Sequence, residues 1–323
     1  VLSLVKIDSE APSIPTISPE SGFYNNGNSS SPLVISWGGS IDSSPGSELK
    51  EYNICKLVQD IGDPGSATES CYNATSLSLT ETGLTEGKLY KYKVMAIDNA
   101  GNESAYTSYI EITIDRTGPD APSLSCVVPN APWSNSSASI VWGPVPDNTG
   151  GIGIIKNYYL YRSSAVCNSP LCPQPSDPFP GSLYQTLSSP TSNYNEGYAV
   201  PGDNETIFRY RVNADDTLNN PGDPSNDCNI IVDTDPPVTS VITQVPASPN
   251  LDGWYNTDVS FELDVSDNLS GRDLEFPKHK INDGAWIAAD MSFIIYNESA
   301  TNTLSIQSQD NAGNMEVANE IYS

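Results

Sequence analysis

The sequence has few basic residues, and this shortage excludes several classes of partner. It contains 14 Lys and Arg against 40 Asp and Glu in 323 residues, a formal net charge of −26. Binding to nucleic acid or to an anionic membrane surface requires clustered positive charge, which this chain lacks. We therefore expect neither partner.

Histidine is nearly absent, which removes most common catalytic machinery. With His279 as the only histidine, a zinc site of three histidines cannot be built and a Ser-His-Asp triad cannot be assumed. The sequence has no Gly-x-Ser-x-Gly elbow and no nucleotide-binding Gly-rich motif. The Gly-rich stretch 150–153 has no predicted helix after it that could hold a phosphate.

Carboxylates are abundant, so hydrolysis by a carboxylate pair has to be considered. Such a pair must face a substrate across a cleft. The candidates lie at strand ends or in turns, where we interpret them as solvated: Asp215, Asp216, Asp264 and Asp267. We therefore expect no enzyme activity.

Long apolar runs and long stretches free of Pro and Gly are also missing. No run approaches the ~20 residues of a membrane span, and 26 Pro and 23 Gly interrupt most windows that could form a helix. Apolar residues make up 37% of the chain, with 17 Tyr and 5 Trp, which suffices for packed cores. The composition predicts an acidic, all-β, multidomain protein.

Six cysteines suggest disulfides and thus an oxidising, extracellular setting. From their spacing we expect the pairs Cys55–Cys71, Cys126–Cys228 and Cys167–Cys172. Other pairings of the last four, and buried free thiols, remain open. A chain that begins at Val1 rather than Met is consistent with removal of a signal peptide or with trimming.

The chain also contains sequons for N-linked glycans. Its Asn, Ser and Thr content alone would yield a similar number, so they are only permissive evidence for a glycoprotein. The acceptor residues are Asn28, Asn73, Asn102, Asn135, Asn204, Asn268 and Asn297.

Internal repeats divide the chain. Residues 90–102, 208–220 and 304–314 each alternate like a half-buried strand and end in an acidic, Asn-rich turn. Residues 112–122 and 230–237 each read as a last strand followed by an acidic, Pro-containing linker. These repeats predict domains at 9–116, 117–235 and 236–323, after an N-terminal strand at 1–8.

One segment, 48–60, has both helical and strand character. Its alternation of Tyr52, Ile54 and Val58 with polar residues favours a strand that places Cys55 opposite Cys71.

The first two domains share an order of features: Trp37 and Trp142 close early strands, and in the first domain Leu84 precedes Tyr90 and Tyr92. This order resembles fibronectin type III and related immunoglobulin-like modules, in which such a turn comes before the penultimate strand. The resemblance implies three tandem immunoglobulin-like (fibronectin type III-like) β-sandwiches with an N-terminal orphan strand. It implies an extracellular scaffold and no particular chemistry.

The third domain lacks the early Trp. Its segments 253–255, 266–271 and 283–286 are similar to those of immunoglobulin-like repeats in prokaryotic surface proteins. Its aromatic residues Trp254, Tyr255 and Trp286 could form a sugar-stacking platform, but we expect them in the core or at a domain interface.

Residues 1–8 repeat the unit of last strand and linker although no domain precedes them, whereas the third domain has a short or missing last strand. We hypothesise that this strand completes the third domain of a neighbouring copy, which would give a head-to-tail filament. A fragment of a longer array, pairing within the first domain, and a last strand that is simply short remain alternatives. The polymerisation residues would be Val1, Leu2, Leu4, Val5 and Ile7, and the acceptor end Met315, Val317, Ile321 and Tyr322.

Calcium is the ion that best suits this composition, because it prefers carboxylate, amide and carbonyl oxygens. Turn chemistry alone is the alternative explanation for the acidic turns. Linker residues Asp115, Asp120, Asp233 and Asp235 could close sites between domains. The candidate ligands are Asp98, Asn99, Asn102, Asp115, Asp310, Asn311 and Asn314.

The sequence thus favours a structural subunit of an extracellular filament or surface layer that binds copies of itself. It would need no cofactor beyond calcium and glycans. The alternative is an adhesin stalk, or the non-catalytic carbohydrate-binding region of a secreted multidomain protein, with glycans or a cell surface as partner.

Overall fold

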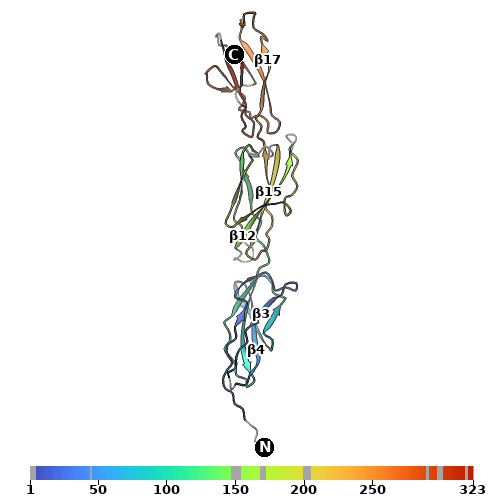
Figure 1. Cartoon of the computed structure of the whole chain (residues 1–323), viewed down its shortest axis with the longest axis vertical. Coiled ribbons are helices and arrows are strands. Elements are labelled where there is room, and N and C mark those ends of the chain that lie inside the picture. The colour runs from blue at the N-terminus through green and yellow to red at the C-terminus, as the bar shows by residue number, and fades with distance from the viewer. Residues whose placement is uncertain are drawn as a thin grey trace. The chain divides into compact units, whose positions relative to one another are not determined.

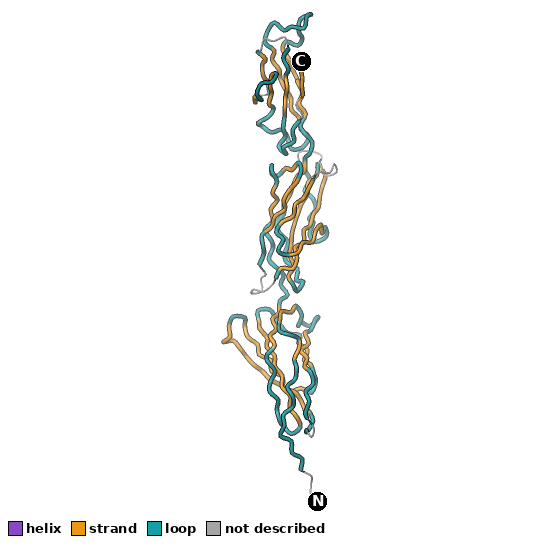
Figure 2. Tube along the Cα trace, turned by 60° about the vertical axis from the view of Figure 1, so that its left-hand side comes forward, coloured by secondary structure: helices purple, strands orange, loops and turns teal. Residues whose placement is uncertain are grey.

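The structure is a computed structural model that describes residues 5–43, 46–146, 154–167, 172–198, 205–288, 291–296, 301–316 and 319–322. Throughout these ranges the regular elements are β-strands, and Figure 2 shows strands joined by loops with no helix. None of the described segments is a helix that could span a bilayer. The all-β prediction is confirmed.

The first two sheets use only strands from residues 17–114. One sheet has the order β1-β3-β6 and the other β2-β8-β7-β4-β5. Figure 1 labels β3 and β4 on them. Their bounds are β1 Ile17–Ser18, β2 Gly22–Tyr24, β3 Leu33–Trp37, β4 Leu49–Asp60, β5 Asp63–Ala74, β6 Ser78–Glu81, β7 Lys88–Asp98 and β8 Ile110–Ile114.

The next two sheets repeat this arrangement with residues 124–232. Their orders are β9-β11-β14 and β10-β16-β15-β12-β13. In both sandwiches a short strand, β2 or β10, pairs in parallel with the last strand. The bounds are β9 Leu124–Val127, β10 Trp133–Ser134, β11 Ser137–Trp142, β12 Ile155–Val166, β13 Leu183–Ser188, β14 Asn193–Gly197, β15 Thr206–Asp216 and β16 Cys228–Val232.

The last pair of sheets has the orders β17-β18-β21 and β20-β19-β22-β23. It includes a last strand, β23, which pairs with β22. The last strand of this region is therefore short, with four residues, and not missing. The bounds are β17 Val238–Val245, β18 Val259–Ser266, β19 Lys278–Ile281, β20 Ile287–Ala288, β21 Ser292–Ile295, β22 Leu304–Gln307 and β23 Asn319–Tyr322.

This topology confirms the immunoglobulin-like, fibronectin type III-like fold class. By its internal contacts the chain divides into two compact units. The first comprises Val1–Asp120, Val145–Asn157 and Ala214–Asp223; the second comprises Ala121–Pro144, Tyr158–Asn213 and Pro224–Ser323. The predicted boundaries at 116 and 235 remain predictions, although no described strand pairs across them.

Strand alternation places the predicted aromatic residues in the cores. In β3 and β11 every second side chain is buried, which brings Trp37 to 6.0 Å from Tyr52 and Trp142 to 5.7 Å from Tyr158, measured between ring centroids. These tryptophans are thus core residues, because a half-buried strand presents one face to the opposite sheet.

The third sandwich builds its core differently. Phe261 stacks on Phe293 at 5.3 Å between ring centroids, and His279 stacks on Phe293 at 4.4 Å. Burial lowers the pKa of His279. The histidine is therefore part of the core, and its lowered pKa favours the neutral imidazole.

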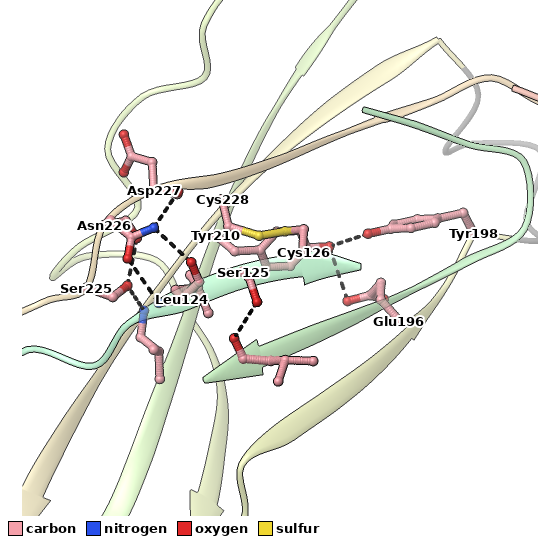
Figure 3. Close-up of a disulfide and its surroundings, with 12 residues drawn as sticks. Leu124, Ser125, Cys126, Glu196, Tyr198, Tyr210, Ser225, Asn226, Asp227 and Cys228 are labelled. Atoms are coloured by element: carbon pink, nitrogen blue, oxygen red, sulfur yellow. Dashed lines mark hydrogen bonds between the residues drawn. A yellow bond between two sulfur atoms is a disulfide. The ribbon is translucent and has the colours of Figure 1, made fainter. Parts of the chain in front are cut away.

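Segment 48–60 is the strand β4, as its alternation predicts, and Cys55 lies directly opposite Cys71 in β5. The structure forms three disulfides, with the pairs that the spacing predicts: Cys55–Cys71, Cys126–Cys228 and Cys167–Cys172. Figure 3 shows the second one, which joins β9 in one sheet to β16 in the other.

Candidate functional site

The turn that follows β7 is closed by one carboxylate. Asp98 Oδ1 accepts a hydrogen bond from the backbone amide of Asn102, and Asp98 Oδ2 accepts one from Asn102 Nδ2, both at 2.8 Å. Gly101, between them, has a φ of 93°, a conformation that glycine adopts without steric cost. The Asp-x-x-x-Asn spacing thus makes a fixed turn from local residues.

The same turn recurs twice. Asn220 donates to Asp216 with distances of 2.9 Å from its backbone nitrogen and 2.8 Å from Nδ2. Asn314 donates to Asp310 at 2.8 Å in both bonds. All three aspartates are buried. The interpretation of Asp216 and its neighbour Asp215 as solvated turn residues is therefore wrong: both are buried, and Asp215 Oδ1 accepts the backbone amide of Asn157 at 2.9 Å.

Each of the three asparagines also holds a linker. A second hydrogen bond from its Nδ2 reaches the main-chain oxygen of an aspartate that precedes the sandwich in sequence. We call this arrangement the linker clamp. Its three instances are Asn102 to Asp8 at 3.3 Å, Asn220 to Asp115 at 3.1 Å, and Asn314 to Asp233 at 2.9 Å.

The linker after β8 is fixed on its other side as well. Arg116 donates from Nε to the carbonyl oxygen of Asn25 at 3.1 Å, from Nη1 to that of Leu84 at 3.1 Å and from Nη2 to that of Asn26 at 2.9 Å. A Cβ atom on Gly118 would lie 2.1 Å from the carbonyl oxygen of Pro221, so this position accommodates only glycine without a backbone shift.

Three carboxylates meet in the second unit, one from a linker, one from a loop and one from a turn. Asp233 follows β16, Asp267 follows β18 and Asp310 follows β22; one oxygen from each lies within 4.8 Å of the others. Asp233 is 0% and Asp310 is 1% exposed. We call this group the C-terminal triad. Two unit charges about 5 Å apart repel by roughly 3 kcal/mol at an effective dielectric constant of about 20, so the group is costly as it stands.

The pKa values reflect this cost. Burial, reinforced by repulsion from Asp267 and Asp310, raises the pKa of Asp233. Burial also raises the pKa of Asp310, with repulsion from Asp267 added, although Asn314 donates hydrogen bonds to the carboxylate. A carboxylate that accepts such bonds normally has a lowered pKa, so crowding and burial dominate here.

Two buried side-chain oxygen atoms at this triad make no hydrogen bond. Asp267 Oδ1 accepts the amides of Leu269 and Gly271 at 3.0 and 2.6 Å, but Oδ2 is buried and accepts no hydrogen bond. Ser270, 7% exposed, donates its amide to Asp233 Oδ2 at 3.0 Å. Its hydroxyl lies near the Asp233 carboxylate and opposes the rise in the pKa of that group, but it makes no hydrogen bond of acceptable geometry.

An equivalent group, the N-terminal triad, lies in the first unit. Asp8, Asp42 and Asp98 also bring one oxygen each within 4.8 Å of the others. Both carboxylate oxygens of Asp42 are buried without a hydrogen bond. Burial acts to raise the pKa of Asp98, but hydrogen bonds from Asn102 and from the turn amides outweigh it and leave the pKa below its ordinary value.

Sequence reasoning identified part of these triads. It selected Asp98 and Asp310 as calcium ligands and the linker residue Asp233 as a candidate for a site between domains, and the structure places all three in the triads. It missed Asp8, Asp42 and Asp267. A signal was present, since Asp42 lies five residues after Trp37 and Asp147 lies five residues after Trp142; Asp147 is outside the described residues.

The side-chain nitrogens of the predicted amide ligands donate to backbone oxygens. Asn99 Nδ2 donates to the carbonyl oxygens of Ser47 and Glu48 at 2.9 and 3.0 Å, and Asn311 Nδ2 donates to that of Ser270 at 2.8 Å. Asn102 and Asn314 form the linker clamps. Asp115 contributes its main-chain oxygen to a clamp, and Asp235 donates its amide to Asp233 Oδ1 at 3.2 Å.

The sequons occupy varied environments. Asn102 Nδ2 donates two hydrogen bonds, and a glycan on that atom would disturb them, so a glycan there stays a prediction. Asn73 and Asn268 are exposed, whereas Asn28 and Asn135 are half-buried. Asn204 and Asn297 lie outside the described residues.

The aromatic residues of the third sandwich are less buried than expected. Trp254 is 54% and Trp286 is 38% exposed, so neither is a core residue. Lys280 Nζ lies 5.3 Å from the Trp286 ring centroid. Tyr255 packs against the core, with its hydroxyl accepting from Gln244 Nε2 at 2.6 Å. Only Tyr255 fits the expected role.

The proposed polymerisation residues are only partly described. Val5 is 80% and Ile7 is 84% exposed, and residues 5–8 form no strand. In Figure 1 this segment leaves the end of the first sandwich. Val1, Leu2, Leu4 and Val317 lie outside the described residues; Met315 is exposed, and Ile321 and Tyr322 belong to β23.

The sequence of this chain is similar to parts of two longer proteins. No protein-family model matches it. It is 24% identical over 323 residues to Exoglucanase B of Cellulomonas fimi, covering 98% of this chain and 26% of that protein. It is 25% identical over 166 residues to Chitinase A1 of Niallia circulans, covering 50% of this chain and 21% of that protein. The chain thus spans about a quarter of the length of these curated relatives.

Among solved structures, the fibronectin(III)-like modules of Clostridium thermocellum CbhA match 68% of this chain and 94% of their own, with a TM-score of 0.32 and 16% identity. The chicken CNTN1 FN1–FN3 domains match 97% and 99%, with a TM-score of 0.31 and 14% identity. Domains A168–A170 of titin match 68% and 66%, with a TM-score of 0.39 and 14% identity.

Proposed function

We propose that this chain is a non-catalytic, extracellular structural region of a larger secreted protein, in which tandem fibronectin type III-like sandwiches carry and space other parts. The single observation that carries the proposal is the linker clamp, present three times at equivalent turns. The match of nearly the whole chain to about a quarter of Exoglucanase B supports it.

The clamp suits a spacing role because it restrains the linker. A free linker samples many backbone conformations, and each residue held in one conformation loses roughly 1–2 kcal/mol of conformational entropy. Hydrogen bonds from Asn220 to Asp115, and from Arg116 to the carbonyl oxygens of residues 25, 26 and 84, offset part of that cost. A spacer needs linkers with few conformations, and the repeated clamps restrict each linker in this way.

The buried polar groups serve structure rather than catalysis in this proposal. Tyr210 Oη lies 2.9 Å from Tyr198 Oη and donates to Glu196 at 3.4 Å, beside the disulfide in Figure 3. Arg162 Nη1 lies 3.4 Å from Glu196 Oε1. Burial raises the pKa of Tyr210 above its ordinary value. These groups satisfy one another inside the sandwich.

The extracellular placement rests on the three disulfides, which persist in oxidising compartments. The acidic surface, with a net charge of −26, favours solubility.

Incubation of the purified chain with cellulose and with chitin tests this function. We expect no release of soluble sugar from either polymer. Sedimentation with the insoluble polymers distinguishes a plain spacer from a carbohydrate-binding region: a plain spacer stays in the supernatant, and binding lost on Trp254→Ala or Trp286→Ala would identify the exposed tryptophans as a sugar platform. Release of sugar by the pure chain would refute the proposal.

A filament subunit is the second candidate, because two described surfaces fit strand addition. Val5 and Ile7 present apolar side chains to solvent. In the described part of the third sandwich no strand covers the outer edge of β23, whereas β2 covers β8 and β10 covers β16. Such an edge can accept a strand from another copy.

Electron microscopy of the full chain and of a deletion of residues 1–8 tests this second candidate. A filament subunit forms polymers only with residues 1–8 present. Monodisperse particles from the full chain at high concentration would contradict it.

A further inference from the structure

We propose that the N-terminal and C-terminal triads each bind one divalent cation of the calcium type. This inference goes beyond the spacing function and does not depend on it, because it rests on the local chemistry of two sites within the two compact units.

The first argument is uncompensated charge. Each triad gathers three carboxylates with oxygens within 4.8 Å of one another. None of the ion pairs found in the described ranges involves any of these six aspartates; the cationic partners go to other acids. Asp98, Asp233 and Asp310 are buried and the other three are half-buried. Like charges gathered in such a place are costly unless a cation neutralises them. A divalent ion would neutralise two of the three charges in each triad.

The second argument is independent of charge and concerns oxygen atoms left without a partner. In the C-terminal triad, Asp267 Oδ2 is buried without a hydrogen bond. The hydroxyl of Ser270, a residue that is 7% exposed, lies beside Asp233 and is also buried without a hydrogen bond. In the N-terminal triad both oxygens of Asp42 are buried without a hydrogen bond. Buried polar atoms are rarely unpaired. A coordinated ion satisfies such atoms together.

The other oxygens are already held in place. Asn314 fixes both oxygens of Asp310, and Asn102 fixes both oxygens of Asp98. Asp8 accepts the amides of Glu10 and Ser47 at 3.1 and 2.7 Å. Hydrogen bonds that orient a ligand in this way reduce the entropy lost on binding a metal.

The donor chemistry selects the ion. Both sites offer carboxylate oxygens, and the C-terminal site adds a hydroxyl, with no histidine or free cysteine among them. Hard oxygen ligands favour Ca²⁺ or Mg²⁺ over zinc or copper. Ca²⁺ accepts about six to eight oxygens in irregular geometry, whereas Mg²⁺ demands a near-octahedral set. Ligands from a linker and two loops fit the calcium pattern, with water completing the shell.

The consequence for the protein is a link between segments far apart in sequence. A cation in the C-terminal triad connects the residue after β16 with the loop after β18 and the turn after β22. The clamp joins two of these segments through Asn314 and Asp233; the ion would add the third through Asp267.

Titration calorimetry and thermal melting test the proposal on the full chain, stripped with a chelator and then supplied with CaCl₂. We expect at least two calcium ions per chain and a midpoint that rises by several degrees. Asp42→Asn and Asp267→Asn should each lower the stoichiometry by one, and the double variant by two. Asp264→Asn, an exposed aspartate on β18 near the site, is the matched control and should bind as the native chain does.

A further variant separates loss of binding from loss of folding. Ser270→Ala keeps all carboxylates and should weaken one calcium site about tenfold, as expected when one contact of hydrogen-bond strength is lost. Circular dichroism in chelator confirms that each variant is folded. Absence of binding heat and of any melting shift at millimolar calcium overturns the proposal, as does full stoichiometry in the double variant.

Discussion

Asn220 donates a hydrogen bond from Nδ2 to the main-chain oxygen of Asp115, a residue 105 positions earlier, at 3.1 Å. The same amide nitrogen donates to Asp216 Oδ2 at 2.8 Å. One side chain therefore closes a turn and holds a linker together. Because Asn102 and Asn314 do the same, a short turn motif becomes the device that anchors each linker.

Replacing Asn220 with Ala should destabilise the first compact unit by about 2–3 kcal/mol. The change removes the side-chain donor to the main-chain oxygen of Asp115 and to Asp216 Oδ2, and loss of a donor to a buried acceptor costs about 1–3 kcal/mol. Urea unfolding followed by fluorescence measures the loss. Asn229→Ala, at an exposed position of β16, is the control and should change stability by less than about 0.5 kcal/mol. Equal effects of the two variants would contradict the clamp.

Arg116→Lys should cost about 2 kcal/mol although it preserves the charge. The guanidinium donates to three carbonyl oxygens from three different nitrogens, and a single ammonium group cannot match that geometry. Thermal unfolding at fixed pH measures the effect. Lys91→Arg, in the partly exposed pair with Glu111, is the reciprocal control, and we expect almost no change there.

The disulfides should contribute unequally. Cys126 and Cys228 are separated by 102 residues and Cys167 and Cys172 by 5. In the loop-entropy treatment, closing these loops stabilises the fold by about 4.7 and about 2.2 kcal/mol, respectively. The double Ser variant of the first pair should therefore show the larger fall in unfolding free energy. The opposite order would mean that native packing, rather than loop length, governs their contribution.

Asp267→Asn should stabilise the chelated protein at pH 7, by about 2 kcal/mol, because it removes one of three crowded charges. The pKa values of Asp233 and Asp310 are raised in the folded state. The folded chain therefore binds more protons than the unfolded chain at mildly acidic pH. This contribution to stability is full below the unfolded pKa of about 3.9 and is lost as pH rises through the folded values.

Melting in chelator between pH 4 and pH 8 measures this effect, and the advantage of Asp267→Asn should grow as the pH rises. If calcium binds as proposed, the sign reverses in its presence, because the variant then loses a ligand. A variant that is less stable than the native chain in chelator at pH 7 would show that Asp267 is not repelled by its neighbours. Asp264→Asn again serves as the control.

Local sequence patterns predicted much of the fold. Alternation identified β4 as a strand and placed Trp37 and Trp142 in the cores, because a strand with one buried face needs period-two burial. The spacing of Cys55 and Cys71 matched their register in the hairpin. Where the pattern was weaker, in the third sandwich, the expectation for Trp254 and Trp286 was the core or a domain interface, and their exposure excludes the core.

From the sequence alone, alternation and residues close in sequence predicted the class of fold, the hairpin disulfide Cys55–Cys71 and the acidic turns, whereas the pairing of the other four cysteines stayed open until the sheets were in place. Only the tertiary structure decided which acids meet. Asp267 and Asp233 come from different loops, and nothing local indicates that their oxygens lie within 4.8 Å of each other and of Asp310. It also decided that Nδ2 of Asn102 and of Asn314 donates to the main-chain oxygen of a linker aspartate. The physical reason is that burial and proximity between distant segments depend on how the sheets pack, which no local pattern specifies.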